Sequence, residues 1–157
     1  MKTTISSLLL VPCILVSVAV SSFAAEDWQA SLTISSGNAT SRLTFGQHPD
    51  ATDDVDGLYD VPALLSGQLQ AAFVNDEATL WRDIRAIGSG TLLEWRIDIA
   101  ATTGKTIILS WNREKLPENA KLTLIELDSG ERIDMSRVST YSIDMDQGEL
   151  IIEANDY

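Results

Sequence analysis

Apolar and polar residues alternate along most of this chain, and that period limits the fold more than any other feature of the sequence. In LLEWRIDIA, residues 92–100, every second residue from Leu93 to Ile99 is apolar and charged residues stand between them; the period recurs in 28–34 and 107–111. A period of two is typical of half-buried β-strands, and the Gly- and Asp-rich segments between the runs are typical of turns. The sequence therefore predicts an all-β fold: an antiparallel β-sandwich of about seven to nine strands, immunoglobulin-like or jelly-roll-like.

The first 24 residues have the features of a secretory signal peptide. Lys2 supplies a positive start, Leu8–Val20 is apolar, and Ser22 and Ala24 are small residues at a cleavage position. The apolar run is shorter than the roughly 20 residues of a membrane span. We therefore predict a signal peptide over 1–24 and a single β-sandwich domain over 25–157. The product is expected to be secreted, into a periplasm or to the cell surface and medium, with no membrane span after cleavage.

Charge and cysteine content narrow the range of partners. The chain has 11 basic and 23 acidic residues, a net charge of −12 at pH 7, and its one cysteine lies within the predicted signal peptide. Such an acidic chain repels nucleic acid and anionic lipid. Without a disulfide, the domain must rely on its core, on a bound metal ion or on a partner. The expected partners are an extracellular protein or a polysaccharide.

Five aspartates lie in the one long interval that has no strand or helix period, residues 46–66. They are Asp50, Asp53, Asp54, Asp56 and Asp60. Calcium prefers several hard oxygen ligands on irregular loops, so these residues are the predicted calcium ligands. An EF-hand is excluded, because Thr52 and Ala63 would occupy its first and last ligand positions. The alternatives are a solvated acidic loop and neutralisation by Arg82 and Arg85.

Trp81 differs from the other three tryptophans, which are in phase with aliphatic residues and are predicted to lie in the core. Under strict alternation Trp81, Asp83 and Arg85 share one face of a strand. A tryptophan beside charged hydrogen-bonding groups suits a carbohydrate or a peptide, so these three residues are the predicted ligand-binding site. The alternatives are a tryptophan over the rim of the sandwich and an Asp83–Arg85 pair that clamps the acidic loop.

No catalytic constellation is visible in the sequence. His48 is the one histidine, and neither a G-x-S-x-G motif nor a phosphate-binding loop is present. We therefore expect no enzyme, but a secreted non-catalytic interaction or structural module that calcium stabilises through the acidic loop. The alternatives are a carbohydrate-binding module at Trp81 and a subunit of an extracellular filament or surface layer. In the filament, residues 149–157, ELIIEANDY, would be the edge strand that pairs with a neighbour.

A series of short motifs resembles an accessory β-domain of secreted bacterial and archaeal multidomain proteins. The matching residues are Phe45, Gly46, Pro49, Ala51, Thr52, Asp53, Asp56, Asp60, Val61, Pro62, Asp83, Ile84, Arg85, Trp95, Leu109, Ser110 and Trp111. The resemblance implies a β-sandwich-type module with no established catalytic role. The chain departs from the pattern at Asp54 and Val55, where the family has a glycine and an aromatic residue.

Overall fold

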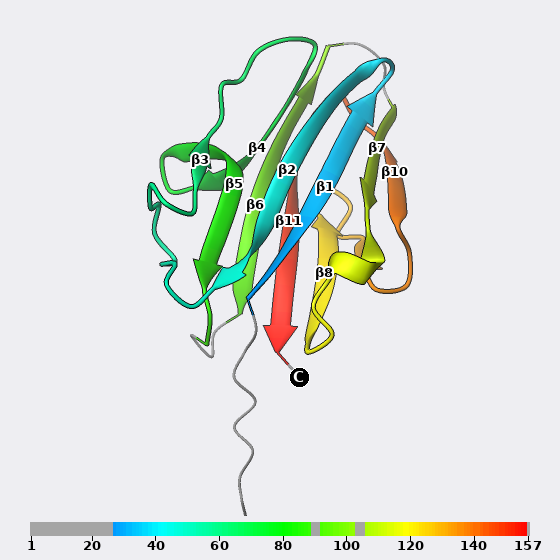
Figure 1. Cartoon of the computed structure of the whole chain (residues 1–157). Coiled ribbons are helices and arrows are strands. Elements are labelled where there is room, and N and C mark those ends of the chain that lie inside the picture. The colour runs from blue at the N-terminus through cyan, green and yellow to red at the C-terminus, as the bar shows by residue number, and fades with distance from the viewer. Residues whose placement is uncertain (1–26, 89–91, 103–105, 157) are drawn as a thin grey trace, which may run out of the picture.

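The computed structural model describes residues 27–88, 92–102 and 106–156, so the predicted signal peptide over 1–24 lies outside the described residues. Within these ranges the chain forms eleven strands and one short 3₁₀ helix, η1 (Arg113–Lys115) (Figure 1). No helix in the described ranges is long and apolar enough to cross a membrane. The strands are β1 (Trp28–Ser36), β2 (Ala39–His48), β3 (Val61–Pro62), β4 (Leu69–Asn75), β5 (Ala78–Ala86), β6 (Leu93–Ala101), β7 (Thr106–Trp111), β8 (Ala120–Glu126), β9 (Arg132–Asp134), β10 (Thr140–Asp144) and β11 (Gln147–Asp156).

All eleven strands belong to one sheet, in the order β10-β7-β1-β2-β5-β4-β6-β11-β8-β9, with β3 added beside β5. Every pairing is antiparallel except β2 with β5, which is parallel. The all-β prediction is confirmed. The prediction of a sandwich of seven to nine strands is wrong, because a single sheet of eleven strands curls into a nearly closed barrel.

The two ends of the sheet meet because residues 135–139 join β9 to β10. The backbone N–H of Trp111 in β7 donates to the Ser139 carbonyl (2.9 Å), and the Trp111 indole donates to the Met135 carbonyl (2.9 Å). The Met135 N–H in turn donates to the Leu122 carbonyl of β8 (3.0 Å). This connection therefore links β7 with β8 where no strand pairing joins them among the described residues.

Aromatic side chains from opposite walls of the barrel meet in its core. Trp95 of β6 lies 5.4 Å from Phe45 of β2 and 5.9 Å from Trp28 of β1, ring centroid to ring centroid, in edge-to-face contacts. Phe73 of β4 packs on Phe45 at 6.1 Å. Such edge-to-face pairs add to the free energy that burial alone provides. The predicted core positions of Trp95 and Trp111 are confirmed, whereas Trp28 is only half-buried.

Strand β5 passes from one wall of the barrel to the other. Its residues 78–80 pair with β4, and its residues 82–86 pair with β2. An irregularity between Leu80 and Arg82, opposite β3, shifts the register by one residue. This course of β5 leaves two strand edges without a partner in the described chain. Residues 39–43 of β2 pair with β1 on one side and with no strand on the other. Residues 69–72 of β4 likewise pair with β6 on one side and with no strand on the other.

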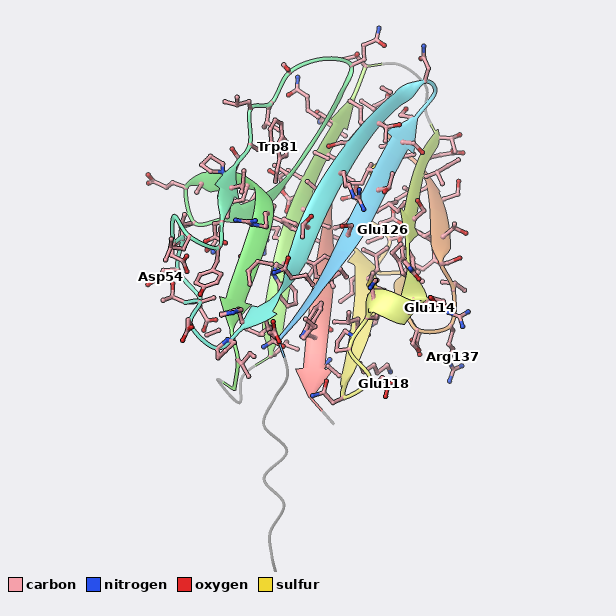
Figure 2. The ribbon with its side chains drawn as sticks, in the orientation of Figure 1. Asp54, Trp81, Glu114, Glu118, Glu126 and Arg137 are labelled. Carbon is pink, nitrogen blue, oxygen red and sulfur yellow. The ribbon has the colours of Figure 1, made fainter. Side chains whose placement is uncertain are left out.

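Trp81 lies at this irregularity, beside the long connection from β3 to β4 (Figure 2). Leu80 belongs to the core, and Asp83, three residues later, is also buried. A bulge of one residue inverts the alternation of faces along a strand. The alternation that predicts a shared face for Trp81 and Asp83 therefore does not continue through residues 80–83.

The last strand, β11, is an interior strand of the sheet, between β6 and β8. Its residues 147–154 pair with β6 and its residues 150–156 pair with β8. The prediction that ELIIEANDY forms an edge strand is therefore wrong. The sequence contains the reason, because Leu150, Ile151 and Ile152 are consecutive apolar residues and all three are buried, as in strands covered on both faces.

Candidate functional site

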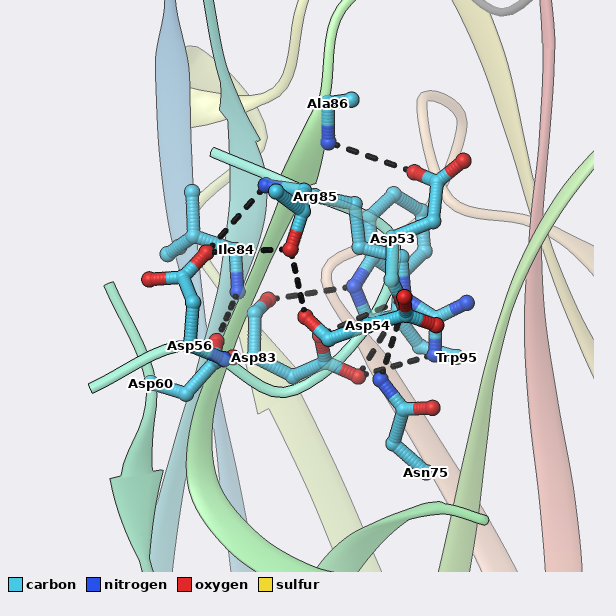
Figure 3. A network of polar contacts seen from close by, with 11 residues as sticks. Asp53, Asp54, Asp56, Asp60, Asn75, Asp83, Ile84, Arg85, Ala86 and Trp95 are labelled. Carbon is cyan, nitrogen blue, oxygen red and sulfur yellow. Dashed lines mark hydrogen bonds and ion pairs between the residues drawn. The ribbon is translucent and has the colours of Figure 1, made fainter. Parts of the chain in front are cut away.

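The acidic loop covers the outer edge of β5. Two of its carboxylates accept hydrogen bonds from backbone N–H groups of that strand: Asp60 from Ile84 (3.0 Å) and Asp53 from Ala86 (3.3 Å) (Figure 3). In an ordinary sheet, carbonyl groups of a neighbouring strand would accept these bonds. The aspartates therefore replace a strand, and they prevent this edge from pairing with another chain.

Asp56 and Asp60 also fix the shape of the loop itself. The Asp56 N–H donates to the Asp60 carboxylate (2.7 Å), and the Asp60 N–H donates to the Asp56 carbonyl (2.9 Å). The Asp56 carboxylate accepts from the N–H groups of Thr52 (3.2 Å) and Tyr59 (3.0 Å). Burial raises the pKa of Asp56, but these backbone hydrogen bonds outweigh it and hold the pKa below its ordinary value.

The five aspartates predicted to bind calcium do not act as one group. Asp53, Asp56 and Asp60 accept backbone N–H groups, while Asp50 and Asp54 are exposed. In the described part of the chain, no three histidine, aspartate or glutamate side chains are grouped so that they could hold a metal ion. This donor arrangement does not fit a calcium site, and calcium binding stays a prediction.

The two arginines proposed as counter-charges make other contacts. Arg82 donates to the carbonyls of Tyr59 (2.6 Å) and Leu58 (3.1 Å), so it holds the loop through backbone oxygen atoms. Arg85 binds Asp83 instead. Among the described residues, neither guanidinium bonds to one of the five loop carboxylates.

Chelation is expected to leave the fold intact. Because N–H donors already satisfy three of the five loop carboxylates, those of Asp53, Asp56 and Asp60, the melting temperature in excess EDTA should agree with that in millimolar calcium to within about 2 °C, a change well below 1 kcal/mol. Thermal unfolding followed by circular dichroism measures this difference. A calcium-dependent rise of several degrees, lost on Asp53→Ala, would instead support the calcium site predicted from the sequence.

Asp83 and Arg85 form a buried ion pair beside Trp95. Asp83 is 1% exposed and the Arg85 side chain 14%, and the pair is closed by an Nη2–Oδ2 contact of 3.0 Å. The Arg85 guanidinium lies 5.9 Å from the Trp95 ring centroid, and the Trp95 indole donates to the Asp83 carbonyl (3.1 Å). Burial raises the pKa of Asp83 above its ordinary value, although Arg85 opposes this shift.

Trp81 lines a separate hollow of about 260 Å³, at the opening between β2 and β4. Its side chain is 37% exposed. The other lining residues come from β2, β4 and the connection before β4: Thr40, Ser41, Arg42, Leu64, Leu65, Ser66, Leu69, Gln70 and Ala71. Of the three residues predicted to bind a ligand, Trp81 lines this hollow, while Asp83 and Arg85 form their own buried pair.

Sequence reasoning did not find the residues around Trp81. Arg42 lies on β2, far from Trp81 in the sequence, and Gln70 lies on β4, the strand before β5; nothing in their local patterns marks either residue. They lie near Trp81 because β5 pairs with β4 only up to Leu80 and with β2 only from Arg82 onward. The register shift between these two residues lies opposite β3.

No family model, curated protein or solved structure matches the chain. The resemblance to an accessory domain of secreted proteins therefore stays a prediction.

Proposed function

We propose that the chain is a secreted, non-catalytic β-module that binds another molecule outside the cell through the hollow at Trp81. The observation that supports this most is an exposed tryptophan set beside both apolar and hydrogen-bonding side chains. Binding sites combine apolar area with a few placed polar groups, and tryptophan and arginine are the residues most often dominant in binding energy.

The apolar part of the hollow extends onto the connection before β4. Leu64 is 76% exposed and Leu65 is also exposed, and both line the hollow with Trp81. Clustered exposed apolar side chains are costly for a monomer in water and mark interaction sites. On the polar side, Arg42 and Gln70 supply hydrogen-bond donors. An extracellular protein or a polysaccharide would meet both kinds of group.

His48 supports the non-catalytic part of the proposal. Its ring stacks on Tyr59 with 4.6 Å between centroids, and its Nδ1 accepts the N–H of Asp50 (3.1 Å). These contacts join His48, at the end of β2, to the acidic loop. The loop in turn covers β5, the strand that carries Trp81, so its role in this function is to hold the site in place.

Trp81→Ala is expected to weaken binding by at least tenfold, because it removes the aromatic side chain that lines the hollow. Its cost in folding stability should be about 1 kcal/mol, since Trp81 is partly exposed. Binding is measured by titrating the protein with soluble oligosaccharides and with peptides selected from a random library. Ile108→Ala is the control, since Ile108 is exposed on β7 and does not line the hollow. The proposal fails if neither class of probe binds, or if Trp81→Ala binds as well as the parent.

A further inference from the structure

We infer that the ligand of the Trp81 hollow is an extended polypeptide segment, which adds as a strand to the free edge of β2. This inference rests on the function proposed above and names the class of ligand. A saccharide at the same hollow is the competing outcome of the test.

The backbone on both sides of the hollow is unpaired. Residues 39–43 of β2 and 69–72 of β4 have no strand partner there, and no other backbone hydrogen bond from these residues is found on those sides within the described ranges. A free strand edge presents N–H and C=O groups at the repeat of a polypeptide. The N–H and C=O groups of another polypeptide match this spacing, as in recognition by strand addition. The hydroxyl groups of a saccharide do not.

The size of the hollow also favours a peptide. Its volume of about 260 Å³ lies below the roughly 300–1,000 Å³ of typical small-molecule sites. It is large enough for one or two side chains. The free edge of β2 beside it spans five residues, about 17 Å of extended chain. A peptide can therefore place one side chain in the hollow while its backbone pairs with the free edge of β2.

The positive charge of Arg42 indicates which residues the bound peptide should contain. Arg42 is the one charged residue lining the hollow, it is exposed, and it has no ion-pair partner in the described chain. A strand beside β2 would place a side chain opposite Arg42, and opposite charges across a strand pair are stabilising. The ligand should therefore carry an acidic residue at that position. Its apolar residue should face Trp81 and Leu65.

The connection before β4 provides a cover for such a segment. It is fixed at one end by the bond from the Ala63 N–H to the Thr79 carbonyl (2.8 Å), and at the other by the bond from the Thr102 N–H to the Gln68 carbonyl (2.8 Å). Between these points Leu64 and Leu65 stay exposed. Packing these leucines on an incoming strand would bury apolar surface that is now in water.

A random eight-residue peptide library displayed on phage provides the probe, selected on the domain over residues 25–157. We expect enrichment of sequences that alternate apolar residues with at least one acidic residue. Affinity for a selected synthetic peptide should fall at least tenfold on Arg42→Glu and recover in part with Arg42→Lys. Lys121→Glu is the charge-matched control and should change affinity less than threefold, because Lys121 is exposed on β8 and does not line the hollow.

Backbone methylation of the selected peptide decides between strand addition and simple side-chain contact. N-methyl groups on one alternate set of amides should abolish binding, and those on the other set should not, because only one edge of the peptide meets β2. Amide exchange within residues 39–43 should slow on binding. Equal binding of both methylated peptides would overturn the inference. If oligosaccharides bind at Trp81 and no peptide does, this inference fails and the proposed function stands; if neither binds, both fail.

Discussion

Replacing Arg85 with alanine is expected to lower the free energy of unfolding by about 3–5 kcal/mol. The substitution leaves the Asp83 carboxylate, 1% exposed, without its counter-charge, and it removes the cation that lies over the Trp95 ring. A loss of this size is a large part of the roughly 5–15 kcal/mol that stabilises a domain. Urea unfolding at pH 7, followed by tryptophan fluorescence, measures it.

A double variant separates the charge effect from lost packing. Asp83→Leu with Arg85→Met removes both charges and keeps side-chain volume, so its stability should lie closer to the parent than that of Arg85→Ala. A cost below about 1 kcal/mol for Arg85→Ala is typical of a solvent-exposed ion pair and would contradict a buried one.

The deficit of Arg85→Ala should also depend on pH. The Asp83 pKa is raised by burial in the parent, and loss of Arg85, which opposes that shift, raises it further. A carboxyl whose pKa is higher in the folded state holds more protons when folded, so its contribution to stability falls as pH rises through the interval between the unfolded and folded pKa values. The deficit should therefore be complete above the folded pKa of the variant and shrink as pH falls below it.

Asp60→Ala is expected to cost about 2–4 kcal/mol, since it removes the acceptor of two backbone N–H groups. One of them belongs to Ile84, which is 1% exposed, so water cannot readily replace the carboxylate. The other belongs to Asp56 and shapes the acidic loop. Chemical unfolding gives the cost, and the Ile84 amide should exchange faster with solvent than in the parent.

Asp54→Ala is the matched control for Asp60→Ala. Asp54 lies in the same loop and is exposed, and no hydrogen bond or ion pair of its carboxylate is found among the described residues. Both variants remove one negative charge, so they differ mainly in the backbone donors that lose an acceptor. Asp54→Ala should change stability by less than about 0.5 kcal/mol. Equal losses in the two variants would contradict the role given to Asp60.

Local patterns predicted strands but not how the strands close into a barrel. The alternation from Leu93 to Ile99 predicts β6, because apolar side chains are buried and charged ones are exposed along a half-buried strand. Closure depends on contacts far apart in the sequence, such as the bond from the Trp111 indole to the Met135 carbonyl. No residue near Trp111 in the sequence indicates that partner, so a sandwich and a barrel have the same local pattern.

The candidate sites show the same limit. The cluster of aspartates was visible in the sequence, but its partners are backbone N–H groups of β5, which no side-chain pattern encodes. The face shared by Trp81 and Asp83 was predicted from a period that the irregularity at Leu80 and Arg82 interrupts. A bulge depends on the opposing strand, here β3, and it is therefore absent from the local sequence signal.

The position of β11 between two earlier strands has a consequence for the order in which the chain folds. β6 and β8 lie on either side of β11, yet both precede it in the sequence. During synthesis neither strand gains its shared neighbour until residues 147–156 have left the ribosome. Pairings between distant segments carry a large loop-closure cost and form slowly. The part of the sheet formed by β6, β11 and β8 therefore closes only at a late stage of synthesis.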